Sequence, residues 1–316
     1  MFNLDTPCCI DEQVILMKKY VAFTKKIRIK RLLNYAGYFR LSRYGKYLLS
    51  FTNVLQSKPS QDILFLVYEF DVELRKLLFS YCKKAEIQFK SILTNAVALK
   101  LNNAIFYLDD NYYTKSCSER DRKKRNSNIN FYPKFKKMIV DTERKLRSNI
   151  NKYPEFKEYR TGGTRVRKKI PSWAAFSYFE FGLITNIYKY LRGDLRKSVL
   201  TYGYSKKKYG KETTKQMDTW LDAIRNLRNI CAHHNRLVGK TSSVVLLDNA
   251  DDISVLPSDT DLFSRIYALK KVLNSKDSQK FKIELQKIIK KSKLDIYQID
   301  ILPRNWEVLF DRINYL

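Results

Sequence analysis

The chain has 316 residues, of which 44% are hydrophobic and 14% are aromatic, so it can bury a substantial core as one large or two modest domains and is not disordered. It carries 61 Lys and Arg residues against 32 Asp and Glu residues, and this net charge of +29 favours a polyanionic partner, most commonly nucleic acid. An anionic membrane surface is the alternative, but the sequence has no run of about 18 apolar residues that would span a bilayer.

The five cysteines show no C-x-x-C pair and no histidine at a spacing typical of zinc sites, so we expect no metal. An odd number of cysteines without a disulfide pattern fits a reducing compartment. The first residues lack the basic and apolar regions of a signal peptide, and we therefore expect a cytoplasmic protein. The five are Cys8, Cys9, Cys82, Cys117 and Cys231.

Residues 1–59 form the first predicted region, a set of short helices broken at Gly37 and Gly45. A break at residues 57–60 follows, and Ser60 is suited to cap the next helix. From there to about Leu101 the sequence has no proline or glycine, and its apolar residues recur at helical spacing. We predict one long helix over this stretch.

Two further helices are predicted in the middle of the chain, after an exposed basic loop at residues 109–130. The first of them runs from Pro133 to Asn151. The second begins at Pro171, because proline is favoured in the first turn, and is expected to end at Gly193.

Three basic runs lie in the connections of this middle region. Each run fits a solvated loop on its own, and together they fit a channel that contacts phosphates. The runs are Arg120–Arg125, Arg165–Lys169 and the triplet Lys206, Lys207 and Lys208.

Residues 212–238 contain no proline, and their apolar side chains recur at steps typical of one helix face, namely Trp220, Ile224, Leu227, Cys231 and Val238. At about 100° per residue, His234 falls within about 20° of this apolar stripe and is expected to point into the packing. Gly239 is the expected end of the helix. The opposite face carries Asp222, Arg225, Arg228, Asn229, His233 and Arg236. Helix geometry alone fits an ordinary solvated surface for this face.

The only two histidines of the chain, His233 and His234, lie side by side in this helix. Histidine as a residue type titrates near neutrality and is the usual proton-transfer group of metal-free catalysis. Any chemistry based on histidine is therefore confined to this position. Cys231, on the apolar stripe, is interpreted as a small core residue.

The C-terminal part is predicted to contain a short strand or turn at residues 241–257 and two lysine-rich helices near residues 258–274 and 277–292. The chain shows no internal repeat and no glycine-rich phosphate loop.

Arg228 and His233 form an R-x4-H motif with a polar residue directly after the arginine, which resembles the signature of HEPN-domain ribonucleases. The longer string from Arg228 to Leu237 resembles the abortive-infection (AbiD/AbiF-like) branch of that superfamily. The family often continues the histidine motif with RLWN, whereas the chain reads Arg236, Leu237, Val238, Gly239 and Lys240 there. Further blocks resemble the family in order from about residue 30 to 310: Leu33–Tyr44, Tyr68–Leu78 with Glu86 and Lys90, Pro171–Ala174 with Phe181 and Gly182, and Pro303–Trp306.

This resemblance implies a mainly α fold, a HEPN-type helical bundle with helical N- and C-terminal extensions. The corresponding division is an N-terminal helical region at residues 1–59, a HEPN-like core at residues 60–240 and a C-terminal extension at residues 241–316. By the same resemblance, the protein is expected to be a metal-independent endoribonuclease of anti-phage abortive infection that needs no cofactor. His233 would transfer the proton, Arg228 would stabilise the transition state and Asn229 would orient them. His234, which makes an R-x5-H spacing with Arg228, is the reserve catalytic candidate.

The resemblance also implies a homodimer, because HEPN nucleases pair two R-x4-H motifs and this chain has one. RNA contacts are expected from Arg225, His234, Arg236, Lys206, Lys207 and Lys208. Glu86 either completes the site or forms a surface pair with Lys90. The main alternative function is a non-catalytic protein that holds a structured small noncoding RNA, and a helical scaffold for other proteins is a third.

Overall fold

The computed structural model describes residues 7–115, 131–149, 151–159, 168–204 and 211–316. These residues form helices and connecting loops without a named strand, so the prediction of a mainly α fold is confirmed. The basic runs Arg120–Arg125 and Lys206–Lys208, and most of Arg165–Lys169, lie outside the described residues.

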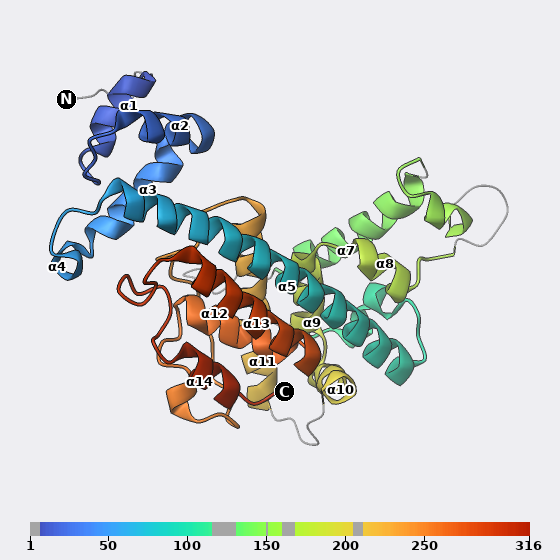
Figure 1. Cartoon of the computed structure of the whole chain (residues 1–316). Helices are drawn as coiled ribbons and strands as arrows, with labels where there is room; N and C mark the ends of the chain where they lie inside the picture. The colour runs from blue at the N-terminus through green and yellow to red at the C-terminus, as the bar shows by residue number, and fades with distance from the viewer. Residues whose placement is uncertain (1–6, 116–130, 150, 160–167, 205–210) are drawn as a thin grey trace.

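The predicted long helix is the central element of the fold, α5 (Gln61–Leu101). The Ser60 hydroxyl accepts a hydrogen bond from the backbone N–H of Ile63, as its capping role requires, and the helix ends at Asn102 in the left-handed conformation. At a rise of about 1.5 Å per residue, α5 is about 60 Å long and crosses the whole molecule (Figure 1).

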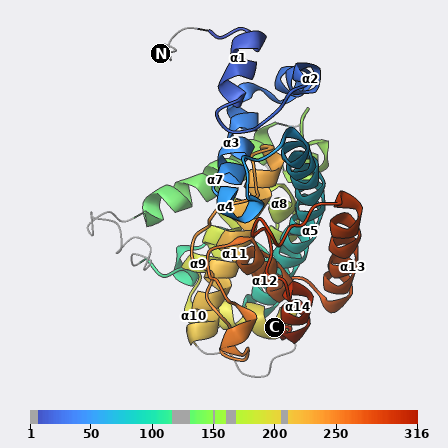
Figure 2. The same ribbon diagram turned by 60° about the vertical axis from the view of Figure 1, so that its left-hand side comes forward.

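The N-terminal region consists of α1 (Ile10–Met17), α2 (Lys26–Ala36), α3 (Tyr38–Leu49) and α4 (Thr52–Leu55). Figure 2 shows α1 and α2 at one end of the molecule, beyond α3 and α4. The predicted break at Gly37 is confirmed, with φ of 79°. The predicted break at Gly45 is wrong: Gly45 lies within α3, where an added Cβ would lie 2.8 Å from the Cβ of Tyr20.

The middle region consists of α7 (Tyr132–Ser148), α8 (Ser172–Tyr178), α9 (Phe181–Tyr190) and α10 (Gly193–Gly203). The prediction of one helix from Pro171 to Gly193 is wrong. Phe179 adopts an extended backbone that ends α8, and its buried ring packs against Tyr107 and Phe176. Gly193 begins a helix and does not end one.

The C-terminal part contributes α12 (Leu262–Val272), α13 (Ser275–Ser292) and α14 (Trp306–Arg312), and α12 and α13 correspond to the two predicted lysine-rich helices. Every residue of α12 is buried, because it packs between α11 (Lys211–Ala232) and α5. The buried Lys271 ammonium lies 2.8 Å from Asp248 and 2.7 Å from Asp251. Residues 241–257, predicted as a short strand or turn, form turns and a short 3-10 helix. They supply both carboxylates that contact Lys271.

Within the described residues, no helix is long and apolar enough to cross a membrane.

Candidate functional site

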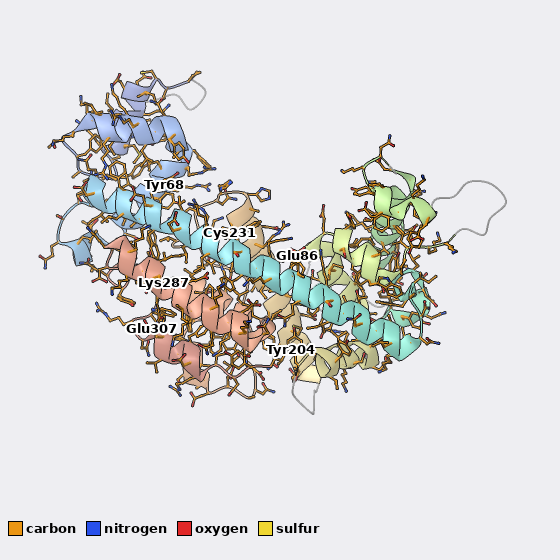
Figure 3. The ribbon with its side chains drawn as sticks, turned by 45° about the vertical axis from the view of Figure 1, so that its right-hand side comes forward. Tyr68, Glu86, Tyr204, Cys231, Lys287 and Glu307 are labelled. Atoms are coloured by element: carbon orange, nitrogen blue, oxygen red, sulfur yellow. The ribbon has the colours of Figure 1, made fainter. Side chains whose placement is uncertain are left out.

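The apolar face of α11 packs where the sequence predicts it. Trp220, Ile224, Leu227 and Cys231 are all buried, between α5 and α12. Burial raises the pKa of the Cys231 thiol to about 12, so this side chain acts as a small core residue. Figure 3 labels Cys231 at the end of α11 and Glu86 on the neighbouring part of α5.

The C-terminal end of α11 lies earlier than predicted, at Ala232 and not at residue 238. The N–H of His234 donates to the carbonyl of Cys231, and the N–H of Asn235 donates to the carbonyl of Ile230. These two bonds make a Schellman motif in which His234 takes the left-handed position, with φ of 52°. The helical projection therefore fails beyond Ala232.

This early end corrects the prediction for His234, which is exposed and does not point into the packing. His233 and Asn235 are exposed beside it. Gly239 does not end the helix; it has φ of +68° in the following loop, where an added Cβ would lie 2.3 Å from the ring of Tyr47. Both histidines are thus accessible to solvent at the end of α11.

Arg228, the arginine of the R-x4-H motif, is half-buried and lies beside Asn229 and Glu86. Its Nη1 donates to the Oδ1 of Asn229 over 3.2 Å, and its Nε lies 3.8 Å from the Oε2 of Glu86. Asn229 is exposed. The structure therefore brings Arg228 and Asn229 into contact, with His233 exposed on the last turn.

Glu86 is only 3% exposed, so the interpretation of Glu86 and Lys90 as a surface pair is wrong. The Nζ atoms of Lys90 and Lys83 lie 2.8 and 3.1 Å from its carboxylate oxygens. Burial alone would raise the pKa of Glu86, but the hydrogen bonds and charges of the two lysines outweigh it and hold the pKa below its usual value. One carboxylate thus faces three cations, since Arg228 is the third.

Arg225 and Arg236 do not join this cluster. Arg225 lies 2.9 Å from Asp222 and 3.3 Å from the hydroxyl of Thr185, which holds it against α9. Arg236 lies on the loop after α11, not on the helix face as predicted, and its Nη1 donates to the carbonyl of Arg43 over 2.9 Å. Burial lowers the pKa of Arg236. The predicted contacts of Lys206, Lys207 and Lys208 lie outside the described residues.

A second polar cluster, which the sequence interpretation did not anticipate, fixes the chain where it leaves α11. The Oδ1 of the buried Asp71 accepts hydrogen bonds from the N–H groups of Leu237 and Val238 over 3.0 and 2.8 Å. Its Oδ2 accepts from the Tyr44 hydroxyl over 2.5 Å and from Arg75. The available signal was the block Tyr68–Leu78, in which an aspartate precedes an arginine by four residues.

An exposed imidazole, an amide and a guanidinium can together transfer a proton and stabilise an anion. No group of three or more histidine, cysteine or carboxylate side chains suited to hold a metal ion occurs in the described part of the chain.

A family model described as Abi-like protein matches residues 31–238 of the chain. The matched segment runs from α2 through α5 and α11 to the loop that Asp71 holds. No curated protein and no solved structure matches the chain.

Proposed function

Because this chain belongs to the Abi-like protein family, which points to abortive-infection defence, we propose that it is a metal-independent endoribonuclease of anti-phage defence. The observation that carries the proposal is the exposed end of α11, where His233 lies one turn from the contacting pair Arg228 and Asn229. Three cations around the single carboxylate of Glu86 give this surface an excess of positive charge that suits a phosphate.

RNA carries its own nucleophile, the 2′-hydroxyl, so cleavage needs a group that takes its proton, a group that protonates the leaving 5′-oxygen, and a cation. His233 performs a proton transfer at the exposed helix end. Arg228 donates to the phosphate oxygens as negative charge develops, and Asn229 orients its guanidinium. The products are a 2′,3′-cyclic phosphate and a 5′-hydroxyl.

A homodimer completes the proposal, because one chain supplies one Arg228–His233 motif and has no histidine outside the adjacent pair His233 and His234. The exposed end of α11 in one copy would meet the same surface of a second copy across a two-fold axis. Each proton-transfer step then has its own imidazole.

The test is RNA cleavage in EDTA by the wild type and by Arg228→Ala and His233→Ala, with analysis of the product ends. We expect a loss of roughly 10²- to 10⁴-fold for His233→Ala, since one proton transfer is removed. Lys76→Ala is the control, because it removes an exposed cation of α5 that pairs with Glu73 and leaves both histidines and Arg228 in place. Equal cleavage by wild type and His233→Ala, or products without cyclic phosphate, would overturn the mechanism.

The net charge of +29 and the cation cluster also favour a second function, a non-catalytic protein that holds a structured small noncoding RNA. RNA binding with a steep negative salt dependence and no cleavage by any variant would favour this function. A protein scaffold would show neither cleavage nor salt-dependent RNA binding.

A further inference from the structure

A groove of about 420 Å³ lies between α5 and α8, next to the cluster around Glu86. Its volume is within the range of about 300–1,000 Å³ that is usual for small-molecule sites. The two helices run antiparallel, since the N–H of Ser172 donates to the carbonyl of Ala104, whereas Lys90 donates to the carbonyl of Phe179. Its lining includes Lys83, Glu86, Lys90, Thr94 and Asn95 of α5 and Trp173 of α8.

One end of the groove is cationic. Lys83 and Lys90 line the groove there beside Glu86, and Arg228 approaches the same carboxylate from α11, so the cations outnumber the carboxylate. An anion that enters this end would therefore meet an excess of positive charge. A phosphate group of a nucleotide has this chemistry.

The other end of the groove is aromatic and polar. Trp173 is 57% exposed, which is unusual for the largest apolar side chain. Thr94 is 2% exposed, and its Oγ1 has no hydrogen-bond partner among the described residues. A buried hydroxyl without a partner is costly, and a ligand that enters the groove beside Thr94 can supply the missing bond. Asn95 adds an amide with both donors and an acceptor.

We propose that this groove binds an unpaired nucleotide of an RNA strand, with the base stacked on Trp173 and its edge bonded to Thr94 and Asn95. Unpaired bases are recognised by stacking on aromatic side chains and by hydrogen bonds to their edges. The adjoining phosphate lies at the end formed by Lys83 and Lys90. Thr94 and Glu86 are eight positions apart on α5, or about 12 Å along the helix, and Arg228 lies 3.8 Å from Glu86, so in this proposal the strand continues toward Arg228.

This inference rests on the proposed function in one respect, namely that the strand in the groove is the one cleaved at Arg228 and His233. The groove then determines which base lies next to the cleaved bond. An apolar peptide is a poorer occupant, because it would leave the excess charge around Glu86 without a partner.

The tryptophans provide a direct binding signal. Trp220 and Trp306 are fully buried, so Trp173 is the single exposed member of the three tryptophans in the chain. Stacking of a base on Trp173 should quench the fluorescence of the full-length protein. The probes are five-nucleotide homopolymers of A, C and U and the corresponding mononucleotides, titrated against the wild type and Trp173→Phe.

We expect quenching by at least one oligonucleotide, at a lower concentration than by its mononucleotide, and no such signal in Trp173→Phe. Thr94→Val keeps the shape but removes the hydroxyl, and should weaken binding of the preferred oligonucleotide by roughly 5- to 10-fold. A mononucleotide that binds as tightly as its oligonucleotide would overturn the RNA assignment in favour of a free nucleotide. RNA binding without quenching would overturn the groove as the base site.

Cleavage assays separate this inference from the proposed ribonuclease activity. In an active enzyme, Trp173→Ala should raise KM by roughly 5-fold or more with little change in kcat, and Trp173→Phe should preserve KM. An active enzyme whose KM does not respond to Trp173→Ala would refute the groove and leave the ribonuclease intact. Quenching in a protein that cleaves no RNA would support the groove and contradict the ribonuclease.

Discussion

Two carboxylates on α5 contact the α11 region, Asp71 the loop after the helix and Glu86 the helix itself. Each pairs with a cation four residues further along α5, namely Arg75 and Lys90. The oxygens of Asp71 are used by backbone N–H groups, a tyrosine hydroxyl and one arginine. The oxygens of Glu86 face three cations, one of them 3.8 Å away and half-buried. The same spacing of carboxylate and cation therefore fixes the loop after α11 at Asp71, whereas at Glu86 it leaves an excess of positive charge.

The difference lies in the partners and not in the helix. Neutral donors complete the hydrogen bonding of Asp71 without adding charge, so that cluster has nothing left to offer a ligand. At Glu86 the hydrogen bonds come from cationic donors, which leave a surplus of positive charge beside an accessible groove. Substitutions in the two clusters should therefore separate an effect on stability from an effect on RNA binding.

The largest effect is expected from Asp71→Ala. Removal of this carboxylate leaves Arg75 buried without its partner and frees the loop after α11, and we expect a loss of about 3–5 kcal/mol in the free energy of unfolding. Chemical denaturation measures it. Arg144→Ala, in an exposed pair on α7, is the control and should change stability by less than about 1 kcal/mol. A loss for Asp71→Ala no larger than for this control would remove the contrast between the two clusters.

Glu86→Gln should cost about 1–3 kcal/mol at neutral pH, because two charged hydrogen bonds weaken. The pKa of Glu86 is lowered on folding, so its stabilisation is fully present above the usual glutamate pKa and is lost as the pH falls through the folded value. The stability difference between wild type and variant should therefore vanish in acid. Glu73→Gln, in an exposed pair with Lys76, is the matched control and should show little difference at any pH.

His234→Gly should stabilise the protein by about 0.5–1 kcal/mol, because glycine adopts φ of 52° without the strain of a Cβ. The midpoint of thermal or chemical unfolding reports this change. His233→Gly, one residue earlier and outside the left-handed region, should destabilise by a similar amount. Effects of the same sign would contradict the described helix end.

A similarly small effect on stability is expected from Lys83→Ala, a loss of about 0.5–1 kcal/mol, since Lys83 is half-exposed and Glu86 keeps Lys90 as a partner. Its effect on RNA should be larger: the slope of log K against log salt concentration should fall in magnitude by about one. Lys76→Ala, seven positions earlier on α5, is the control and should leave the slope unchanged. Equal slopes for both variants would place the RNA away from the Glu86 cluster.

Local signals predicted much of the fold. Ser60 and the absence of proline and glycine defined α5, and the apolar spacing of α11 identified its buried face. The sequence did not predict the end of α11, because His234 occupies the left-handed position in which glycine is usual. It did not predict the burial of Glu86, because a pair four residues apart looks the same on an exposed or a buried helix face. Only the packing of α11 against α5 distinguishes these cases.

The buried helix α12 has a consequence for how this chain can be divided in the laboratory. The family match ends at residue 238, but α12 lies beyond it and covers the apolar sides of both α5 and α11. A polypeptide stopped at residue 240 would lack Tyr267 and Lys271, which pack against the ring of the fully buried Trp220, and would expose this tryptophan to water. We expect such a truncated product to aggregate, and we therefore predict that the recognisable stretch of the sequence does not fold on its own.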